Sequence, residues 1–308
     1  MKQYLSGGYH AISQPAIVAD AGPFALYVLF KVTGSAAAVK SRCGALHQLV
    51  DDINATQPGA DMKAAVSFSP AFCKENGIAT PEDFQSFRAL GEGDTQAPVT
   101  DCDFLVHVHS TRHDLNFFLL RKFVADIAAD VTIVDETYGY RYLDSRDMTG
   151  FIDGTENPEG DDARRDVAII ADGECAGGSM VMLQRYVHSL NAWEPLSVKQ
   201  QEKVIGRTKP DSIELDDVPA TSHVGRVDIK ENGKGLKMVR HSLPYGSVSG
   251  DHGLLFIAYC HTQHVHRTML ESMFGERDGK TDMMLRFTKP VTGAYFYAPS
   301  MEALSVMA

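Results

Sequence analysis

The order of the predicted strands and helices constrains the fold most, because the same order occurs twice along the chain. The first occurrence reads strand, helix, strand, strand, helix, strand, over residues 24–32, 39–53, 64–69, 104–109, 115–129 and 131–134. The strands are short runs of aromatic and β-branched residues, and the helices have an apolar residue at every third or fourth position. This order is typical of the split βαβ arrangement, an antiparallel sheet with helices on one face.

The second occurrence is looser. We predict strands at residues 180–190, 236–243, 254–259 and 295–297, and helices at 197–205 and 262–274. A long insertion, residues 208–235, precedes the second strand, and long loops inside compact domains usually carry function. The sequence therefore predicts an α+β protein with two ferredoxin-like halves, residues 1–145 and 146–308, whose antiparallel sheets face each other with the helices outside.

Charge and composition argue against several classes of protein. The chain has 308 residues and a formal net charge of -11, which argues against a binder of nucleic acid or of an anionic membrane surface. No apolar run approaches the ~20 residues that span a bilayer, and the N-terminus lacks the apolar region of a secretory signal. The five cysteines form no C-x-x-C pair, which excludes c-type haem attachment and makes reduced thiols in a cytoplasmic protein the simplest interpretation.

A loop with two glycines and an Asn-Pro turn holds one carboxylate. The loop runs from Gly150 to Pro158 and places Asp153 between an apolar pair and a glycine. Glycine and Asn-Pro favour a tight, irregular backbone that fixes the direction of this carboxylate. Local chemistry alone leaves an ordinary turn, in which the Asp bonds its own backbone, as an equal alternative.

The histidines are weaker candidates when each is taken by itself. His261 and His264 are three residues apart at a helix start, a spacing that could hold a metal, but no acidic partner accompanies them and we favour a solvated helix start. His107 and His109 alternate with valines and so share one strand face, where packing is the simpler interpretation. His223 stands alone on the long insertion, where a histidine is more often structural than a ligand.

Three separated motifs together resemble the dye-decolourising peroxidases, and most closely their bacterial B-type (P-class) branch. They are G-x-x-D-G at residues 150–154, the histidine at 223, and R-x-S-x-P-Y-G at residues 240–246. The similarity continues through residues 254–256 and 282–287 and covers nearly the whole chain. The family has the same twin ferredoxin-like fold that the order of strands and helices predicts.

The resemblance implies a haem peroxidase that reduces hydrogen peroxide through a ferryl species and oxidises dyes or other one-electron donors. One haem b per chain would have His223 as its axial metal ligand, with Asp282 accepting the hydrogen bond of the other ring nitrogen. Asp153 would be the distal base, and Arg240 would lie beside it, near peroxide and a haem propionate. The other cofactor-binding residues that the resemblance implies are Gly154, Thr155, Ser242, Leu254 and Phe256.

Two other functions stay open at this point. The same pocket would serve haem handling, meaning delivery or iron release, with incidental peroxidase activity, and a ferredoxin-like module without haem is the third interpretation. A closed pocket would exclude bulky dyes, so electrons could travel through Trp193 or a tyrosine. The family is commonly oligomeric, which implies a homo-oligomer. Relatives packed in encapsulin shells have a further C-terminal tail, so we expect that this chain is not shell cargo.

Overall fold

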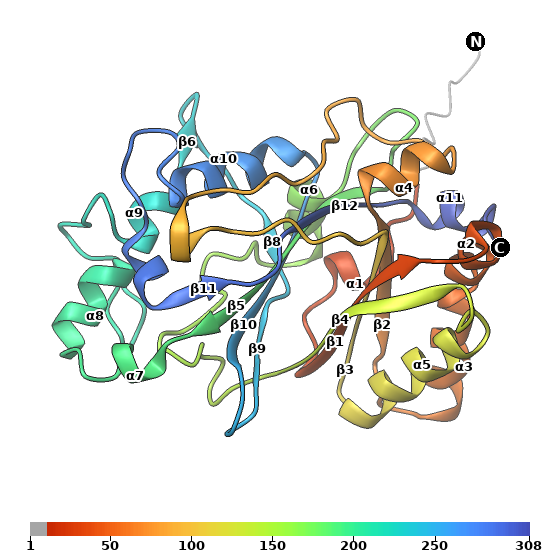
Figure 1. Cartoon of the computed structure of the whole chain (residues 1–308), viewed down its shortest axis with the longest axis horizontal. Helices are drawn as coiled ribbons and strands as arrows, with labels where there is room; N and C mark the ends of the chain where they lie inside the picture. Colours follow the sequence, from red (N-terminus) through yellow and green to blue (C-terminus); the bar gives the residue numbers. More distant parts are fainter. Residues whose placement is uncertain (1–10) are drawn as a thin grey trace, which may run out of the picture.

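The computed structural model describes residues 11–308 and contains a ten-stranded antiparallel sheet with helices packed around it (Figure 1). In the first half the strand order is β4-β1-β3-β2, and each neighbouring pair is antiparallel. The bounds of these strands are β1 Phe24–Val32, β2 Lys63–Phe68, β3 Phe104–Ser110 and β4 Val131–Tyr140. The order is that of the predicted ferredoxin-like half, and β1 has its predicted bounds, whereas β4 continues beyond its predicted end at Val134.

Helices cover the outer face of this half-sheet. The predicted single helix over residues 39–53 is wrong, because Ala45 interrupts it and its N–H bonds back to the carbonyls of Ser41 and Cys43. The predicted helix over residues 115–129 ends earlier, at Ala125. Three pieces were too short to show a helical period in the sequence. The bounds are α1 Pro15–Val18, α2 Ala36–Gly44, α3 Leu46–Thr56, α4 Pro70–Glu75, η1 Gly93–Thr95 and α5 His113–Ala125, where η marks a 3₁₀ helix. Of these, α1 packs on the inner face of the half-sheet instead, and η1 contacts the second half.

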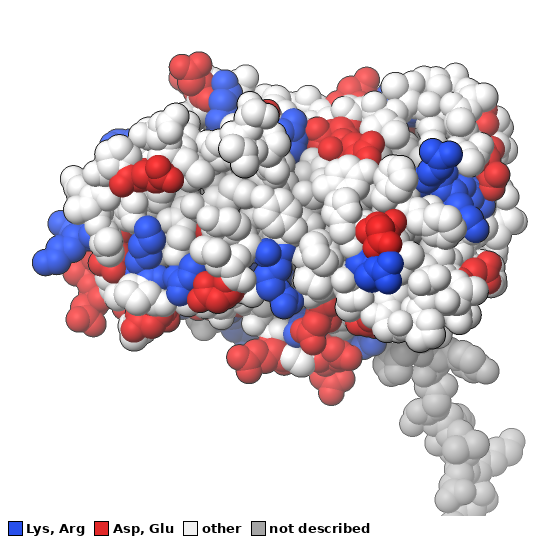
Figure 2. Space-filling model, turned by 90° about the horizontal axis from the view of Figure 1, so that it is seen from below, with Lys and Arg blue, Asp and Glu red and all other residues white. Residues whose placement is uncertain are grey.

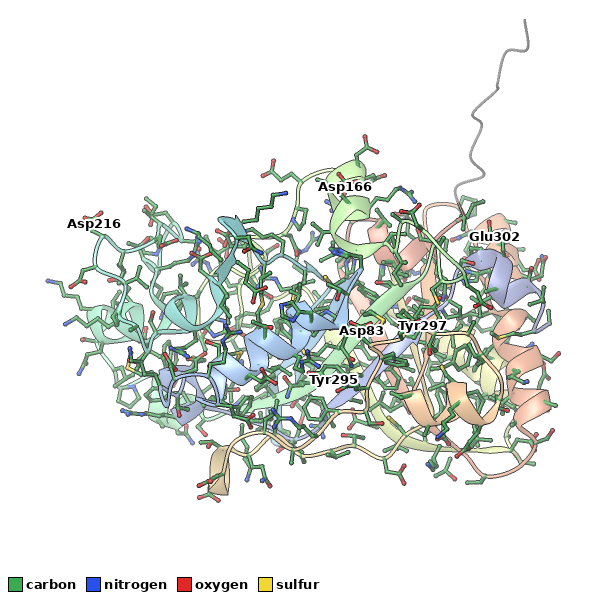
Figure 3. All side chains as sticks on the ribbon, turned by 90° about the horizontal axis from the view of Figure 1, so that it is seen from above. Asp83, Asp166, Asp216, Tyr295, Tyr297 and Glu302 are labelled. Atoms are coloured by element: carbon green, nitrogen blue, oxygen red, sulfur yellow. The ribbon has the colours of Figure 1, made fainter. Side chains whose placement is uncertain are left out.

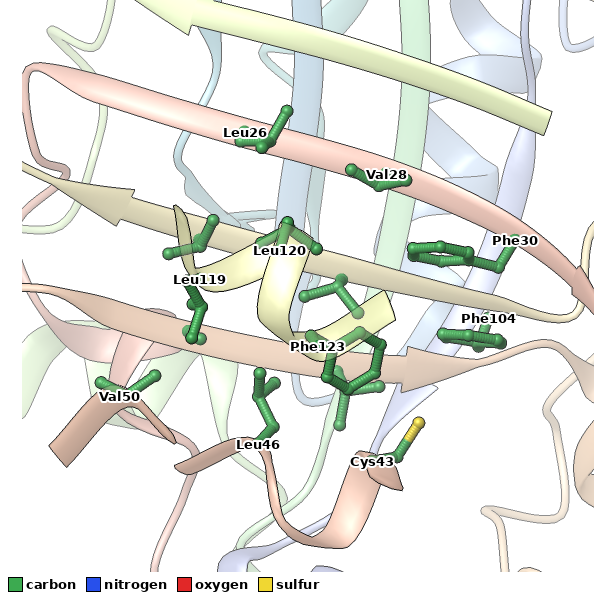
Figure 4. Close-up of a cluster of buried hydrophobic side chains, with 14 of the residues drawn as sticks. Leu26, Val28, Phe30, Cys43, Leu46, Val50, Phe104, Leu119, Leu120 and Phe123 are labelled. Atoms are coloured by element: carbon green, nitrogen blue, oxygen red, sulfur yellow. The ribbon is translucent and has the colours of Figure 1, made fainter. Parts of the chain in front are cut away.

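An outer core fills the space between these helices and one face of the half-sheet. Leu26, Val28 and Phe30 are alternate residues of β1 and point into this core, where each is at most 2% exposed (Figure 4). The same alternation on β3 places its valines in the outer core. His107 and His109 therefore lie on the other face of β3, as the sequence predicts, and both are buried.

The second half has the strand order β12-β5-β10-β8, with β11 beside β5 and β9 beside β10. The predicted continuous strand over residues 236–243 is wrong, since two short strands occupy this region. Between them the Ser242 hydroxyl accepts a hydrogen bond from the backbone N–H of Ile257 at 3.2 Å, which replaces a backbone acceptor of the ladder. The bounds are β5 Ser179–His188, β8 Val239–Arg240, β9 Leu243–Gly246, β10 His252–Cys260, β11 Thr288–Pro290 and β12 Ala294–Ala298.

Several helices of the second half begin at side-chain caps. Ser197 starts α8 with the capping box, as the sequence predicts for an N-cap, and Thr262 caps α10. The long insertion contains α9 and a small hairpin, β6 with β7. The bounds are α6 Asp161–Ala168, α7 Leu190–Trp193, α8 Val198–Ile205, α9 His223–Val227, β6 Lys230–Glu231, β7 Lys234–Gly235, α10 Gln263–Met273, η2 Met283–Arg286 and α11 Met301–Ser305.

The two half-sheets face each other across an inner core, as predicted. This inner core combines Leu29 of β1 with Leu255 and Ile257 of β10, all at most 1% exposed. The halves are also joined at one edge, because β2 and β12 pair at Phe68 and Tyr297. Burial of apolar area at about 25 cal/mol per Å² makes such a shared core the main attraction between the halves.

The helix lengths and the charges on one face complete the description of the fold. Within residues 11–308, none of the helices is long and apolar enough to cross a membrane. The face drawn in Figure 2 carries acidic and basic side chains intermingled with neutral ones, without a continuous basic area.

Candidate functional site

A cavity of about 300 Å³ lies in the second half, between its half-sheet and the helices that cover it. Alternate residues of β5 and β10 form one wall, and α9, α10 and η2 form the other. The volume is at the lower end of the range for ligand and cofactor sites. Most of the wall is apolar, and the apolar residues include Met182, Leu236, Met238, Leu254, Phe256, Met269, Leu270, Met273, Met284 and Leu285.

His223 is the first residue of α9 and contributes an imidazole to the cavity wall. The preceding Ser222 caps the helix by accepting a hydrogen bond from the N–H of Gly225. Nδ1 of His223 lies 2.7 Å from Oδ2 of Asp282, a carboxylate that is 1% exposed. A carboxylate only accepts, so Nδ1 carries the proton and Nε2 of the neutral ring has a free lone pair.

Two opposing effects act on the protonation of His223. Burial lowers the pKa of the imidazole, whereas the charge and the hydrogen bond of Asp282 raise it, and the net shift of the pKa is upward. The second oxygen of Asp282 accepts a hydrogen bond from the N–H of Met284 and so begins η2. Asp282 is therefore fixed by the backbone and in turn fixes the ring of His223.

Asp153 lies in the glycine-rich loop and reaches the cavity from its edge. Gly150 and Gly154 have φ of +87° and +82°, values that few other residues adopt without strain. Oδ1 of Asp153 accepts a hydrogen bond from the N–H of Gly154 at 2.7 Å. Burial raises the pKa of this carboxyl, the nearby charge of Arg240 opposes that rise, and the charge of Asp147 adds to it, so that the pKa stays above its ordinary value.

Arg240, the last residue of β8, carries the positive charge that faces the carboxylate of Asp153. Its Nη1 lies 4.0 Å from Oδ1 of Asp153, and both side chains face the cavity. The side-chain amide of Asn157 bonds both the N–H and the carbonyl of Arg240, each at 2.8 Å. These two hydrogen bonds between the glycine-rich loop and β8 set the distance between the carboxylate of Asp153 and the guanidinium of Arg240. The sequence shows Asn157 only as part of a turn signal, so its role as a clamp was missed.

A second polar chain on the cavity wall was not predicted. Nε2 of His188 lies 2.9 Å from Oδ1 of Asp147, and Nδ1 lies 2.7 Å from the hydroxyl of Thr288. Asp147 also accepts hydrogen bonds from the N–H and the hydroxyl of Thr149. Burial raises the pKa of Asp147, but the charge and the hydrogen bond of His188 lower it. The net shift of the pKa is downward. These residues are far apart in sequence, so no motif could have indicated them.

Most of the residues implied by the family resemblance meet at the cavity. Gly154, Thr155, Leu254 and Phe256 line it together with Asp153, Arg240 and His223, while Asp282 stands behind His223. Ser242 lies elsewhere, because its hydroxyl bonds the backbone of Ile257. It lines a smaller cavity of about 140 Å³, which also borders Asp153, Gly154 and Arg240.

The helix-start histidines His261 and His264 bond different partners. Nε2 of His264 lies 2.8 Å from a carboxylate oxygen of Glu231, and both side chains are partly exposed. Nδ1 of His261 bonds the carbonyl of Val167. In the part of the chain that the structure describes, no group of three or more His, Cys, Asp or Glu side chains could hold a metal ion.

The cavity suits a mostly apolar ligand that carries a metal ion for one protein nitrogen to bind. A single imidazole with a free Nε2 is the donor, and the carboxylate behind it raises its basicity. Arg207, Lys237 and Arg240 border the cavity and could pair with anionic groups of such a ligand. A tetrapyrrole with iron and two carboxylates has each of these properties.

Comparisons with known proteins agree with this geometry. Two family models match, described as Dyp-type peroxidase, N-terminal, over residues 14–141 and Dyp-type peroxidase, C-terminal, over residues 144–303. The chain is 37% identical to a dye-decolorizing peroxidase of Mycobacterium tuberculosis over 302 residues, which cover 96% of this chain and 90% of the relative.

Solved structures with the same fold include a dye-decolorizing protein from V. cholerae. It is 64% identical, has a TM-score of 0.94, and the match covers 96% of this chain and 99% of that one. A DypB variant of Rhodococcus jostii RHA1 in complex with heme is 32% identical, with a TM-score of 0.89 and coverage of 95% and 97%. An encapsulated DyP-type peroxidase from Mycobacterium smegmatis is 35% identical, with a TM-score of 0.89 and coverage of 96% and 98%.

Proposed function

The chain belongs to the Dyp-type peroxidase family and is a haem-dependent peroxidase, and we propose that His223, Asp153 and Arg240 are the residues that run its reaction. The substrates are hydrogen peroxide and one-electron donors, which include dyes. The observation that carries the assignment is the meeting of three separated motifs at one apolar cavity. Nε2 of His223 faces that cavity with Nδ1 already bonded to Asp282.

The residues fit haem b, one per chain. His223 would be its axial ligand, Leu254 and Phe256 would form the wall on the side of the half-sheet, and Arg240 would lie beside a propionate. When bound, haem supplies the iron that binds peroxide and holds its oxidising equivalents. Gly154 and Thr155 would border the group from the glycine-rich loop. Ser242 would act through the backbone of β10, since its hydroxyl bonds Ile257.

Asp153 and Arg240 have complementary tasks on the peroxide side. A carboxylate oxygen of Asp153 takes the proton from the inner oxygen of peroxide and gives it to the outer oxygen, directly or through one water. The guanidinium of Arg240 favours the ionised carboxylate and stabilises negative charge on the departing oxygen. The apolar wall excludes bulk water, so these charges act in a medium of low dielectric constant.

Haem handling is the weaker alternative. A carrier would need His223 and the apolar wall, but it would have no use for a carboxylate and a guanidinium held 4.0 Å apart on the cavity edge. The homo-oligomer, the cytoplasmic location and the absence of packing in a shell stay predictions. The encapsulated relative from M. smegmatis shows that this fold can be enclosed.

The first experiment is an absorption spectrum of the haem-loaded protein before and after one equivalent of peroxide. We expect a Soret band and a rapid spectral change in the wild type, and a lost or shifted Soret band in His223→Ala. His264→Ala is the matched control, because it removes a partly exposed histidine that is bonded to Glu231 instead. Normal haem ligation in His223→Ala would overturn the axial assignment. A wild type that binds haem but does not react with peroxide would favour haem handling.

A further inference from the structure

A cluster of buried rings between the two half-sheets has no part in the proposed reaction. His107, His109 and His241 form a triangle with ring centroids 5.4, 5.7 and 6.0 Å apart. Tyr27 stacks on His107 with centroids 4.9 Å apart and planes 7° from parallel, and Tyr259 bonds the same imidazole. All five side chains are at most 3% exposed. Buried histidines without a charged partner are costly, so this arrangement needs an explanation.

The hydrogen bonds define the state of each imidazole. Nδ1 of His109 accepts from the N–H of Gly22 at 3.0 Å, so its proton is on Nε2. Nε2 of His241 donates to the carbonyl of Ile17 at 2.9 Å, so its Nδ1 has a lone pair. Nδ1 of His107 lies 2.9 Å from the hydroxyl of Tyr259. Over residues 11–308, three ring nitrogens of this cluster are buried without a hydrogen-bond partner: His107 Nε2, His109 Nε2 and His241 Nδ1.

These histidines are neutral. Burial lowers the pKa of His107 well below its usual value, and the neighbouring His109 and His241 lower it further. Burial also lowers the pKa of His109 to about 3 and that of His241 to about 4. At neutral pH His107 therefore has a lone pair to offer, and the short contact assigns that lone pair to the phenol of Tyr259.

Tyr259 differs from the other buried tyrosines in its acceptor. Tyr27 donates to the carbonyl of His241, and Tyr186 donates to the side-chain amide of Gln184. Backbone carbonyls also accept from the two remaining buried tyrosines with a described hydroxyl bond, Tyr245 and Tyr297. An amide oxygen is a very weak base, whereas the lone pair of a neutral imidazole can accept the strongly acidic proton of a phenol that has lost an electron. Among the buried tyrosines with a described hydroxyl bond, Tyr259 is thus the one whose hydroxyl bonds an imidazole.

Tyr259 is also close to the haem cavity. Leu254 and Phe256 of β10 line the cavity, and Tyr259 lies on the opposite face of the same strand. It pairs with Val239, the residue before Arg240. Only the thickness of the half-sheet separates the phenol from the cavity wall.

We propose that Tyr259 and His107 form a redox-active pair that receives one of the two oxidising equivalents produced at the haem. The inference rests on the proposed function, which supplies the oxidant. Tyr259 loses one electron to the oxidised haem, and its phenolic O–H bond breaks while an N–H bond forms at Nδ1 of His107. When an external one-electron donor reduces the phenoxyl radical, the proton returns from His107 to the oxygen. The cluster is buried, so the radical is kept from water and from side reactions.

Freeze-quenched electron paramagnetic resonance on the haem-loaded protein tests the pair. The sample is mixed with one equivalent of peroxide without a reductant, and ring-deuterated tyrosine identifies a tyrosyl signal by its narrower hyperfine pattern. We expect a tyrosyl radical in the wild type and its loss in Tyr259→Phe, with the Soret band and the rate of the peroxide step unchanged. His107→Gln keeps a hydrogen-bond partner but removes the base, so the signal is expected to be lost there too.

Tyr295→Phe is the matched control, because Tyr295 is another buried tyrosine and packs with the cavity residues Met182 and Leu270. Tyr295 lies on β12 and is labelled in Figure 3. The radical is expected to persist in this variant. An unchanged radical in Tyr259→Phe, or a wild type that reacts with peroxide and forms no tyrosyl radical, would overturn the inference and leave the peroxidase intact. A protein that takes up haem but does not react with peroxide would overturn the proposed function, and the pair would lose its oxidant with it.

Discussion

At the scale of single residues, the carboxylate of Asp153 sets the acid limit of the peroxide reaction. It accepts a proton only when ionised, and burial has already raised its pKa. The rate of the peroxide step should therefore fall as pH falls through that pKa. The neighbouring charges of Arg240 and Asp147 shift the pKa of Asp153 in opposite directions. Removing each charge should therefore shift the acid limit in opposite directions, which a general loss of site structure would not do.

Arg240→Leu and Asp147→Asn should move the acid limit in opposite directions. Arg240 favours the ionised carboxylate, so its loss raises the pKa of Asp153 further and moves the limit to higher pH. Asp147 disfavours the ionised form, so its neutral isostere lowers that pKa and moves the limit to lower pH. Stopped-flow measurement of the first Soret change against pH distinguishes the two. Shifts of the same sign in both variants would contradict the charge argument.

Asp282→Asn should weaken haem binding while the fold is kept. The amide has one acceptor oxygen in place of two, so it cannot accept from both Nδ1 of His223 and the N–H of Met284, and the negative charge that raises the pKa of His223 is lost. Loss of such a partner typically costs about 10–100-fold in metal affinity. Titration of the apoprotein with haem gives the affinity. Asp126→Asn, which removes a surface partner of Arg42, should leave it unchanged.

At the scale of elements, two helices offer the same cap with different consequences. Ser222 caps the five-residue helix α9 that presents His223, and Ser197 caps α8. Ser222→Ala and Ser197→Ala should each lower the free energy of unfolding by about 1 kcal/mol. Only Ser222→Ala should also weaken haem binding, because only α9 presents the axial ligand. Urea unfolding and haem titration of both variants check this, and equal haem affinities would show that the cap does not position His223.

Features that adjacent residues determine could be predicted from the sequence, whereas features that depend on distant contacts could not. The strand at Phe24–Val32 and the cap at Ser197 are set by adjacent residues, and both have the predicted bounds. The strand over residues 236–243 was mispredicted because a serine side chain replaces a backbone acceptor in the middle of an otherwise suitable apolar pattern. The short helices α1 and α4 contain too few turns to show a period.

The site residues also fall into two groups: those in sequence motifs and those brought together only by packing. Asp153, His223 and Arg240 lie in motifs that a known family carries, so they could be named before their positions were known. The Asp147–His188–Thr288 chain and the ring cluster around His107 join segments that are remote in sequence. Alternation on β3 could predict which face of the strand His107 occupies. It could not predict that Tyr259 of the other half would face it, because that contact depends on how the halves pack.

At the scale of the whole molecule, the inner core ties the predicted halves together. The division near residue 145 stays a prediction, but both half-sheets bury apolar residues in the same core. Either half alone would expose its apolar inner face to water, so we expect the chain to unfold as one unit. Trp193, the single tryptophan, is 1% exposed and belongs to the second half, which makes its fluorescence a reporter on that half.

Leu29→Ala in the first half should therefore destabilise the surroundings of Trp193 in the second. Leu29 is 1% exposed in the inner core, and truncation of a buried leucine typically costs about 2–5 kcal/mol. In a urea titration the Trp193 fluorescence transition should move to lower urea and coincide with the transition in far-ultraviolet circular dichroism. Val134→Ala, at a side chain 41% exposed on the edge strand β4, should leave the midpoint nearly unchanged. If the halves were independent, the Trp193 transition of Leu29→Ala would stay in place while the circular dichroism curve divided into two steps.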